Sequence, residues 1–169
     1  GLLKFDPAKD EYTIFNLSDG LQNYEFNRGA AYKNASGKLF FGGISGLNYF
    51  YPDSISINEN IPPVSFTYFE ITGEWGRTFL PLERTLAVEV MKGNRTFTIG
   101  FAALDFTAPE NNRYRYKMEK QGSSGTWIDF GNQHNVTFYN LSPDNYTFSV
   151  KGSNNDNVWN HREVSLNVT

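Results

Sequence analysis

The chain has 169 residues, no cysteine and a formal net charge of −3. Without cysteine it can have no disulfide framework, no thiolate metal site and no cysteine nucleophile. Positive and negative residues are interspersed without a basic run, which argues against nucleic-acid binding, and no apolar stretch of about 18 residues is present to span a bilayer.

The composition predicts an all-β protein. There are fifteen Phe, ten Tyr and three Trp residues, and large aromatic side chains are favoured on the pleated surface of a sheet. Fifteen Gly residues, with many Asn and Asp residues, supply the turns that frequent chain reversals require.

The first third of the chain reads as short strands between tight turns. Strands are predicted at Leu2–Phe5 and Tyr12–Phe15, followed by a turn at Ser18–Leu21. A β-hairpin is predicted over residues 38–51, with its turn at Ile44-Ser45-Gly46.

This region contains an internal repeat. The sequence Gly1-Leu2-Leu3-Lys4-Phe5-Asp6-Pro7 is echoed by Gly46-Leu47-Asn48-Tyr49-Phe50-Tyr51-Pro52, 45 residues further on. A period of 40–45 residues with about four short strands per unit is typical of β-propeller blades. We therefore expect residues 1–60 to be the end of a propeller, one complete repeat and part of another.

The remainder predicts a β-sandwich. Ile61-Pro62-Pro63 forms a stiff junction, because proline fixes φ and restricts the residue before it. About seven strands follow, which suits an immunoglobulin-like or fibronectin III-like sandwich over residues 61–169. The alternating apolar sets are Val64, Phe66 and Tyr68; Leu86 to Val90; Phe97, Ile99 and Phe101; Tyr114, Tyr116 and Met118; Val136 and Phe138; Tyr146, Phe148 and Val150; and Val164, Leu166 and Val168.

One local motif supports this sandwich. Leu141-Ser142-Pro143-Asp144-Asn145-Tyr146 has the form of a tyrosine corner, in which the phenol of Tyr146 bonds back to nearby backbone. The alternative, Tyr146 as a ligand-stacking residue, is disfavoured because Tyr146 opens an apolar strand.

Taken together, these residues resemble a known family. The resemblance is to the last propeller repeat and the Y_Y_Y domain of periplasmic sensor regions in hybrid two-component systems of Gram-negative, glycan-degrading bacteria. It is carried by Phe41 to Ile55, Asn58 and Pro62-Pro63-Val64; by Asn94, Phe97, Phe106, Pro109 to Asn112, Tyr114, Tyr116 and Met118; by Trp127; and by Tyr139 to Pro143, Tyr146, Phe148, Asn154, Asp156 and Trp159. Asn157 stands where the family commonly has Gly, and asparagine also tolerates the left-handed conformation.

The resemblance implies a function. Upstream propellers would recognise an oligosaccharide outside this fragment, and the sandwich would relay the signal toward a membrane helix after Thr169 and a histidine kinase beyond it. The chain would be the periplasmic part of an inner-membrane protein, itself non-catalytic. Its partners would be the upstream blades of the parent chain and a second copy bound through the sandwich.

Five aromatic residues are expected to anchor the fold. They are Trp127, Tyr146, Trp159, Tyr114 and Tyr116. Trp127 and Trp159 stand at positions that the resemblance matches, where we expect buried packing.

The chain offers few groups for catalysis or cofactor binding. The two histidines, His134 and His161, lie in no visible triad pattern, and Asp105, Glu110 and Asp129 are interpreted as solvated charges rather than as a glycosidase pair. We therefore expect no catalytic residue and no cofactor.

Other readings of single segments stay open. The oxygen-rich segment Asn154–Asn157 could suit Ca²⁺, but the same residue types serve a turn, so no metal is expected. Trp75, flanked by turn residues, could stack on a sugar, contact a partner or fold back onto Phe79.

Two other functions compete with the relay. The chain could be a stand-alone secreted carbohydrate-binding sandwich, or the accessory β-domain of a larger secreted enzyme.

Overall fold

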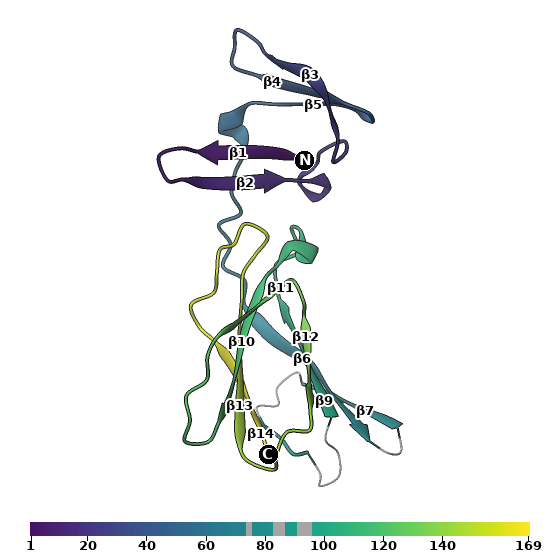
Figure 1. Cartoon of the computed structure of the whole chain (residues 1–169), viewed down its shortest axis with the longest axis vertical. Coiled ribbons are helices and arrows are strands. Elements are labelled where there is room, and N and C mark those ends of the chain that lie inside the picture. The colour runs from purple at the N-terminus through teal and green to yellow at the C-terminus, as the bar shows by residue number, and fades with distance from the viewer. Residues whose placement is uncertain (74–75, 83–86, 91–95) are drawn as a thin grey trace. The chain divides into compact units, whose positions relative to one another are not determined.

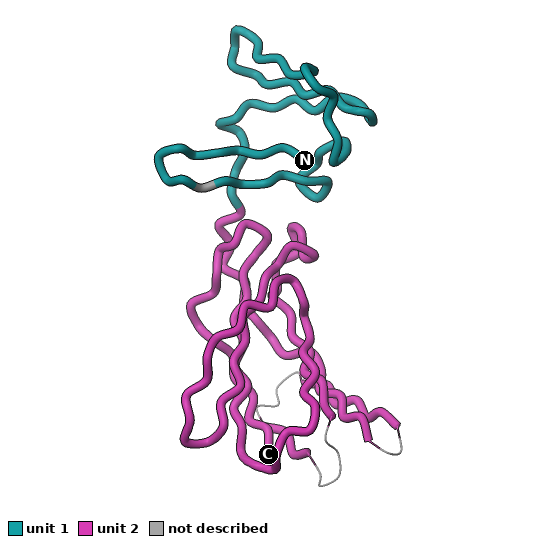
Figure 2. Tube along the Cα trace, in the orientation of Figure 1, with its two compact units in different colours: residues 1–57 teal, residues 58–169 magenta. Residues whose placement is uncertain are grey.

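The computed structural model describes residues 1–73, 76–82, 87–90 and 96–169. Strands make up 53% of the chain, which confirms the all-β prediction. The chain divides into two compact units, residues 1–57 and residues 58–169 (Figure 2). No helix among the described residues is long and apolar enough to cross a bilayer.

Unit 1 contains a hairpin and a three-stranded antiparallel sheet (Figure 1). The hairpin pairs β1 (Leu2–Asp6) with β2 (Glu11–Phe15). The sheet has the order β3 (Phe26–Lys33), β4 (Leu39–Gly43) and β5 (Gly46–Phe50), and short 3-10 turns lie at Leu17–Asp19 and Pro52–Ser54. The predicted strands at both ends of the repeat are confirmed, whereas β3, a polar segment with a register shift, was not predicted.

The β4–β5 turn differs by one residue from the prediction. Its loop has two residues, Ile44 and Ser45, and Gly46 opens β5 opposite Gly43. Gly46 has φ +131°, a conformation that residues with a Cβ rarely adopt, so glycine is required at this position.

Unit 2 is a sandwich of two sheets (Figure 1). One sheet has the order β12 (Asn135–Tyr139), β9 (Thr96–Ala103), β6 (Val64–Gly73) and β7 (Gly76–Pro81). The other has the order β11 (Ile128–Gly131), β10 (Tyr114–Lys120), β13 (Tyr146–Gly152), β14 (Val164–Val168) and β8 (Ala87–Val88). A third 3-10 turn lies at Pro109–Asn111.

The core lies between these two sheets. Phe69, Ile99, Phe101, Phe148, Val150 and Leu166 are each 0% exposed. The phenylalanine rings among them pack on one another, as in the contact of Phe101 with Phe148, whose ring centroids are 6.0 Å apart. Most members of the alternating apolar sets therefore belong to one contiguous core or pack against it.

The predicted inward position of Tyr68 is wrong. A register shift between Phe66 and Tyr68 adds a residue to β6, so that Phe69 takes the next core position. Tyr68 lies instead over Gly100, where an added Cβ would collide with its ring.

Two strands of the sandwich were not predicted. The β7 strand is exposed at every position, and β11 is only four residues long, so neither has the alternating apolar pattern that marks a half-buried strand. The segment predicted at 86–90 contains β8, and its first residue lies outside the described part of the chain.

Candidate functional site

The first residue of unit 2, Asn58, is held by loops far from it in sequence. Its backbone N–H donates to Oδ2 of Asp156 at 2.6 Å. Its side-chain Nδ2 lies 3.1 Å from each carboxylate oxygen of Asp105 and 2.9 Å from Oδ1 of Asn155. The residue that follows unit 1 is therefore fixed to the β9–η3 loop and to the β13–β14 loop. We call Asn58, Asn60, Asp105, Asn154 and Asp156 the junction clamp.

Asn154 is the centre of the β13–β14 loop. It is fully buried, and its Nδ2 donates to the carbonyl oxygens of Asn58 and Asn60. Its Oδ1 accepts from the backbone N–H groups of Asp156 and Val158, both at 2.9 Å. One amide thus closes its own loop and binds the junction segment, because asparagine carries both donors and an acceptor.

Asp105 receives several hydrogen bonds. It is 3% exposed, and the side chain of Asn60 donates to its Oδ2 at 2.7 Å. This bond is the main cause that holds the pKa of Asp105 below its usual value; bonds from Asn58 and Thr107 add to it, while burial opposes it. Asn112, also buried, donates to the backbone oxygen of Asp105 at 3.1 Å and fixes the loop.

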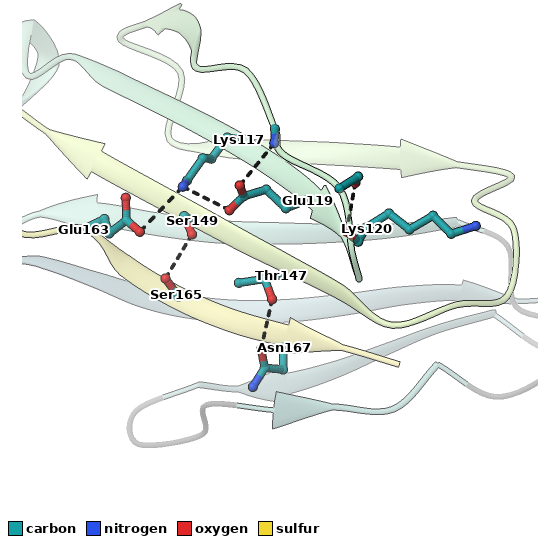
Figure 3. A network of polar contacts seen from close by, with 10 residues as sticks. Lys117, Glu119, Lys120, Thr147, Ser149, Glu163, Ser165 and Asn167 are labelled. Atoms are coloured by element: carbon teal, nitrogen blue, oxygen red, sulfur yellow. Dashed lines mark hydrogen bonds and ion pairs between the residues drawn. The ribbon is translucent and has the colours of Figure 1, made fainter.

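The loop that binds Asn58 leads directly into β14. This strand is paired on both sides, antiparallel to β13 and parallel to β8. Side chains on its outer face add to the pairing, since Ser149 and Ser165 are joined by a 2.9 Å hydrogen bond and Thr147 donates to Asn167 at 3.3 Å (Figure 3).

The last residue is also bonded. The N–H of Thr169 donates to the carbonyl oxygen of Val88 at 3.0 Å. The N–H of Val90 donates to the carbonyl oxygen of Thr169 at 2.7 Å. A single strand, β14, therefore connects the loop that holds Asn58 with the end of the chain.

The outer face of the same sheet carries a network of charges (Figure 3). Nζ of Lys117 lies 2.9 Å from Glu119 and 3.7 Å from Glu163. The hydrogen bond with Glu119 raises the pKa of Lys117, and the N–H of Gly125 bonded to Glu119 lowers the pKa of that carboxylate. The network connects β10 with the segment that precedes β14.

Trp127 and Trp159 lie on this outer face and are only half-buried, contrary to the expected burial. Nζ of Lys117 and Nζ of Lys151 lie 5.1 Å and 4.9 Å from the ring centroid of Trp127. The guanidinium carbon of Arg115 lies 4.5 Å from the ring centroid of Trp159. Both indoles thus pair with cations rather than with the core.

The three tyrosines lie in or against the core. Tyr114 is 4% exposed, and its hydroxyl accepts from the N–H of Ala103 at 3.0 Å. Tyr116 packs on Phe148, with ring centroids 5.7 Å apart. Tyr146 packs at the edge of the core, and its hydroxyl donates to the carbonyl oxygen of Ser142 at 3.0 Å, which is the geometry of a tyrosine corner.

The carboxylates considered for catalysis do not converge. Asp105 lies in the junction clamp, whereas Asp129 pairs with Arg113 and Arg115 on the sheet's outer face. Glu110 lies in η3, where its backbone oxygen accepts from Asn132.

The segment Asn154–Asn157, which was interpreted as a turn rather than a Ca²⁺ site, is closed by a hydrogen bond from the N–H of Asn157 to the carbonyl oxygen of Asn154 at 3.2 Å. Oδ1 of Asn154 and Oδ2 of Asp156 already accept protein hydrogen bonds, and Asn157 adopts φ +61°, as its replacement of glycine suggested. Within the described residues no group of three or more His, Cys, Asp or Glu side chains could hold a metal. Trp75 lies outside the described residues.

Comparison with known proteins identifies the C-terminal part of the chain. Residues 105–169 match the Y_Y_Y domain. This match begins at the junction-clamp residue Asp105 and includes β10, β13 and β14. It confirms the resemblance of this part of the chain to the Y_Y_Y domain.

Relatives match over the whole chain. A histidine kinase, P4, from Formosa agariphila is 33% identical over 176 aligned positions, which cover 100% of this chain and 13% of the relative. The chain therefore spans only a small part of the curated relative it matches.

Solved structures also match over nearly the whole chain. The extracellular domain assigned to a hybrid two-component system of B. thetaiotaomicron has a TM-score of 0.82 and 26% identity, covering 98% of this chain and 23% of that one. A second such domain from the same organism has a TM-score of 0.55 at 18% identity, covering 99% and 22%, and shares the fold. The chain is similar to extracellular sensor regions of two-component systems.

Sequence reasoning identified several residues of the junction clamp but not their role. Asn58, Asn154 and Asp156 belong to the family motif, yet no pattern shows that they meet, because they are almost 100 residues apart. The excess of asparagine at both places was the available signal, since asparagine serves where one side chain must both donate and accept.

Proposed function

We propose that this chain is the extracytoplasmic relay segment of a membrane-bound hybrid histidine kinase. Unit 1 is the end of a ligand-binding propeller, and unit 2 connects it to a transmembrane helix that follows Thr169. The chain itself is non-catalytic and passes on a change in position.

The observation that carries this proposal is the junction clamp. Asn58 is the first residue after unit 1, and it is bonded to the loop that leads into β14. The far end of β14 is bonded through Thr169 to the β8 segment. Displacement of the junction segment therefore acts on the same strand that ends at the exit from the domain.

The relatives support the same role. The structure of 26% identity is an extracellular domain of a two-component system, and the curated relative is a histidine kinase. An extracytoplasmic location, in the periplasm beside the inner membrane, follows from this role. A relay also requires two arrangements that differ by only a few kcal/mol, so that a ligand can bias them.

Oligosaccharide sensing is assigned to upstream propeller blades, outside this chain. A sugar-binding platform requires an accessible aromatic face, whereas the rings of Trp127 and Trp159 are each approached by cations of the sheet. This favours the relay over a stand-alone carbohydrate-binding module. Isothermal titration of the chain with oligosaccharides separates the two: heat of binding supports the module, and none supports the relay.

Self-association through the sandwich belongs to the same proposal, because a two-component kinase works as a dimer. Sedimentation of the chain at high concentration tests this part separately. A dimer supports it, and a strict monomer contradicts it.

Spin-label distances test the relay directly. The chain has no cysteine, so Arg28→Cys in unit 1 and Gln133→Cys in unit 2 give a doubly labelled protein without background. Both residues are exposed. We expect a distribution of label distances that broadens when Asn58→Ala removes the side-chain hydrogen bonds of Asn58 to Asp105 and Asn155.

The matched control is Asn145→Ala, which removes an exposed asparagine at the other end of β13. It should leave the distribution unchanged. If the label-distance distribution is equally wide with Asn58 present and in Asn58→Ala, the clamp does not restrain the two units. That result would contradict the relay.

A further inference from the structure

Four consecutive residues at the start of β10 have contacts on both sides of its sheet. Successive side chains of an extended segment point to opposite faces, so the four alternate between the core and the outer face. Asn112 and Tyr114 are buried, whereas the side chains of Arg113 and Arg115 are about half exposed and both pair with Asp129. Each side of this segment therefore has its own partners.

The core side of the segment holds the end of β9. The hydroxyl of Tyr114 accepts from the N–H of Ala103 at 3.0 Å. Nδ2 of Asn112 lies 3.3 Å from the carbonyl oxygen of Ala103 and 3.1 Å from that of Asp105. Within the described strands, the pairing of β12 with β9 ends at Gly100, so these side chains supply hydrogen bonds that a neighbouring strand would otherwise give. They fix the loop that presents the Asp105 carboxylate to the junction clamp.

The outer side holds the β13–β14 loop. The carbonyl oxygen of Arg113 accepts from the N–H of Ser153 at 2.8 Å. The guanidinium carbon of Arg115 lies 4.5 Å from the ring centroid of Trp159, and Nε of the same residue lies 3.4 Å from Asp129. Because Asp129 holds the guanidinium from β11, Arg115 restricts the position of the indole.

Trp159 is closely linked to the centre of the clamp. It forms an isolated β-bridge with Ser153, across the base of the loop. Its neighbour Val158 donates its N–H to Oδ1 of Asn154 at 2.9 Å and accepts the N–H of Asn154 at 3.2 Å. The loop is thus closed upon itself, with the clamp bonded to Asn154 and Arg115 packed on Trp159.

We infer that Asn112–Arg115 is a positioning segment that couples the two loops of the junction clamp. This inference rests on the proposed function, in which displacement of the junction segment acts on the sandwich. Asn58 is bonded to both loops, but these bonds define one position only when the loops are fixed relative to each other. One short segment holds both loops, so a shift of either loop reaches the other through β10 as well as through Asn58.

Amide exchange in Arg115→Ala tests this coupling. The substitution removes a half-exposed side chain and leaves the core side of the segment intact. We expect exchange to accelerate about three- to tenfold, relative to the core amide of Ile99, at Asp156 and Val158 in the contacted loop. We expect the same at Thr107 in the other loop, whose N–H donates to Oδ1 of Asp105 at 3.1 Å. A role confined to the contacted loop would leave Thr107 unchanged and would overturn the inference.

Lys120→Ala is the matched control. It also removes a basic side chain of β10, one that lies 2.7 Å from Asp144 at the opposite end of the strand. Exchange at Asp156, Val158 and Thr107 should stay at the wild-type rates. Equal acceleration of Thr107 by Lys120→Ala would also overturn the inference, because the effect would then be a general loosening of β10.

A substitution on the core side tests the coupling in the reverse direction. Coupling between two sites is reciprocal, so Asn112→Ala should shift the indole N–H resonance of Trp159 and leave that of Trp127 in place. An unmoved Trp159 resonance would contradict the coupling. Asn112 is buried, so if Asn112→Ala fails to fold, exchange of Thr107 in Arg115→Ala decides the question.

Repeating Arg115→Ala in an Asn58→Ala background separates this inference from the relay. The acceleration at Thr107 should persist, because the proposed connection runs through β10 and not through the Asn58 side chain. Its disappearance would show that Asn58 alone joins the loops, and the positioning segment would be refuted. An unchanged spin-label distribution in Asn58→Ala would instead refute the relay and leave this exchange result intact.

Discussion

The side-chain amide of Asn58 lies 3.1 Å from both carboxylate oxygens of Asp105, although 47 residues separate them in sequence. Asp105 also accepts from Asn60, so one buried carboxylate receives two asparagine side chains of the junction segment. Charged acceptors make stronger hydrogen bonds than neutral ones. Asp105 is thus the residue that most directly holds the junction segment on the sandwich.

Replacing this charge should loosen the junction. Asp105→Asn keeps the shape but adds donors where the partners donate, so we expect a loss of roughly 1–3 kcal/mol in the free energy of unfolding at pH 7. Urea denaturation measures it. Asp129→Asn, at an exposed ion pair, is the control and should cost less than about 1 kcal/mol.

The same substitution has a defined pH dependence. The pKa of Asp105 is lower in the folded state than in the unfolded state. The Asp105 carboxylate therefore stabilises the fold fully above the unfolded pKa of about 3.9, and this stabilisation is lost as the pH falls through the folded pKa. The difference in unfolding free energy between the wild type and Asp105→Asn should therefore shrink below about pH 4. A difference that stays constant down to pH 2 would contradict this role of the charge.

Tyr114 should be the most sensitive tyrosine. Tyr114→Phe leaves the N–H of Ala103 buried without its acceptor, which costs roughly 1–3 kcal/mol of unfolding free energy. Tyr146→Phe removes a bond at a half-buried corner and should cost about 0.5–1.5 kcal/mol. Chemical denaturation of both variants measures these losses, with Tyr139→Phe at an exposed tyrosine as the control. A larger loss of unfolding free energy in Tyr146→Phe than in Tyr114→Phe would contradict the prediction.

Gly100 should tolerate no side chain while Tyr68 covers it. Gly100→Ala places a methyl group against the Tyr68 ring, and we expect a destabilisation of about 1–3 kcal/mol. Adding Tyr68→Ala removes the closest contacts of the new methyl group and leaves Oγ1 of Thr67 at 2.7 Å, so the double variant should lose less than the sum of the two single losses. Simple additivity in thermal or urea denaturation would show that the ring is not the obstacle.

Unit 1 should open far more readily than unit 2. Every described side chain of residues 1–57 is at least partly exposed, whereas unit 2 has a closed aromatic core. Hydrogen exchange of the isolated chain should therefore be fast at β1 to β5 and slow at β9 and β13. Equal protection in both units would mean that unit 1 is stable without further strands.

The apolar alternation of β9, β10, β13 and β14 was sufficient to predict the sandwich and most of its core. Phe97, Ile99 and Phe101 follow the period of two without interruption and are all buried, as expected. Strand β6 shows the limit of the method. Its bulge adds one residue, and from there on period-two reasoning assigns every side chain to the wrong face, Tyr68 first.

The junction clamp was beyond prediction for a different reason. Its contacts are side-chain hydrogen bonds between loops, which obey no periodicity, and their partners are set only once both sheets are packed. The two tryptophans likewise follow the family pattern in sequence, but the outer sheet face places cations beside them, as Lys117 and Lys151 do for Trp127.

Amide exchange along β14 tests the central claim most directly. In residues 1–169, Asn58→Ala should accelerate exchange at the 153–158 loop and also at β14 and Thr169, while Asn145→Ala should leave these amides unchanged. Acceleration that stops at residue 158, with β14 and Thr169 as well protected as in the wild type, would contradict a relay through this strand.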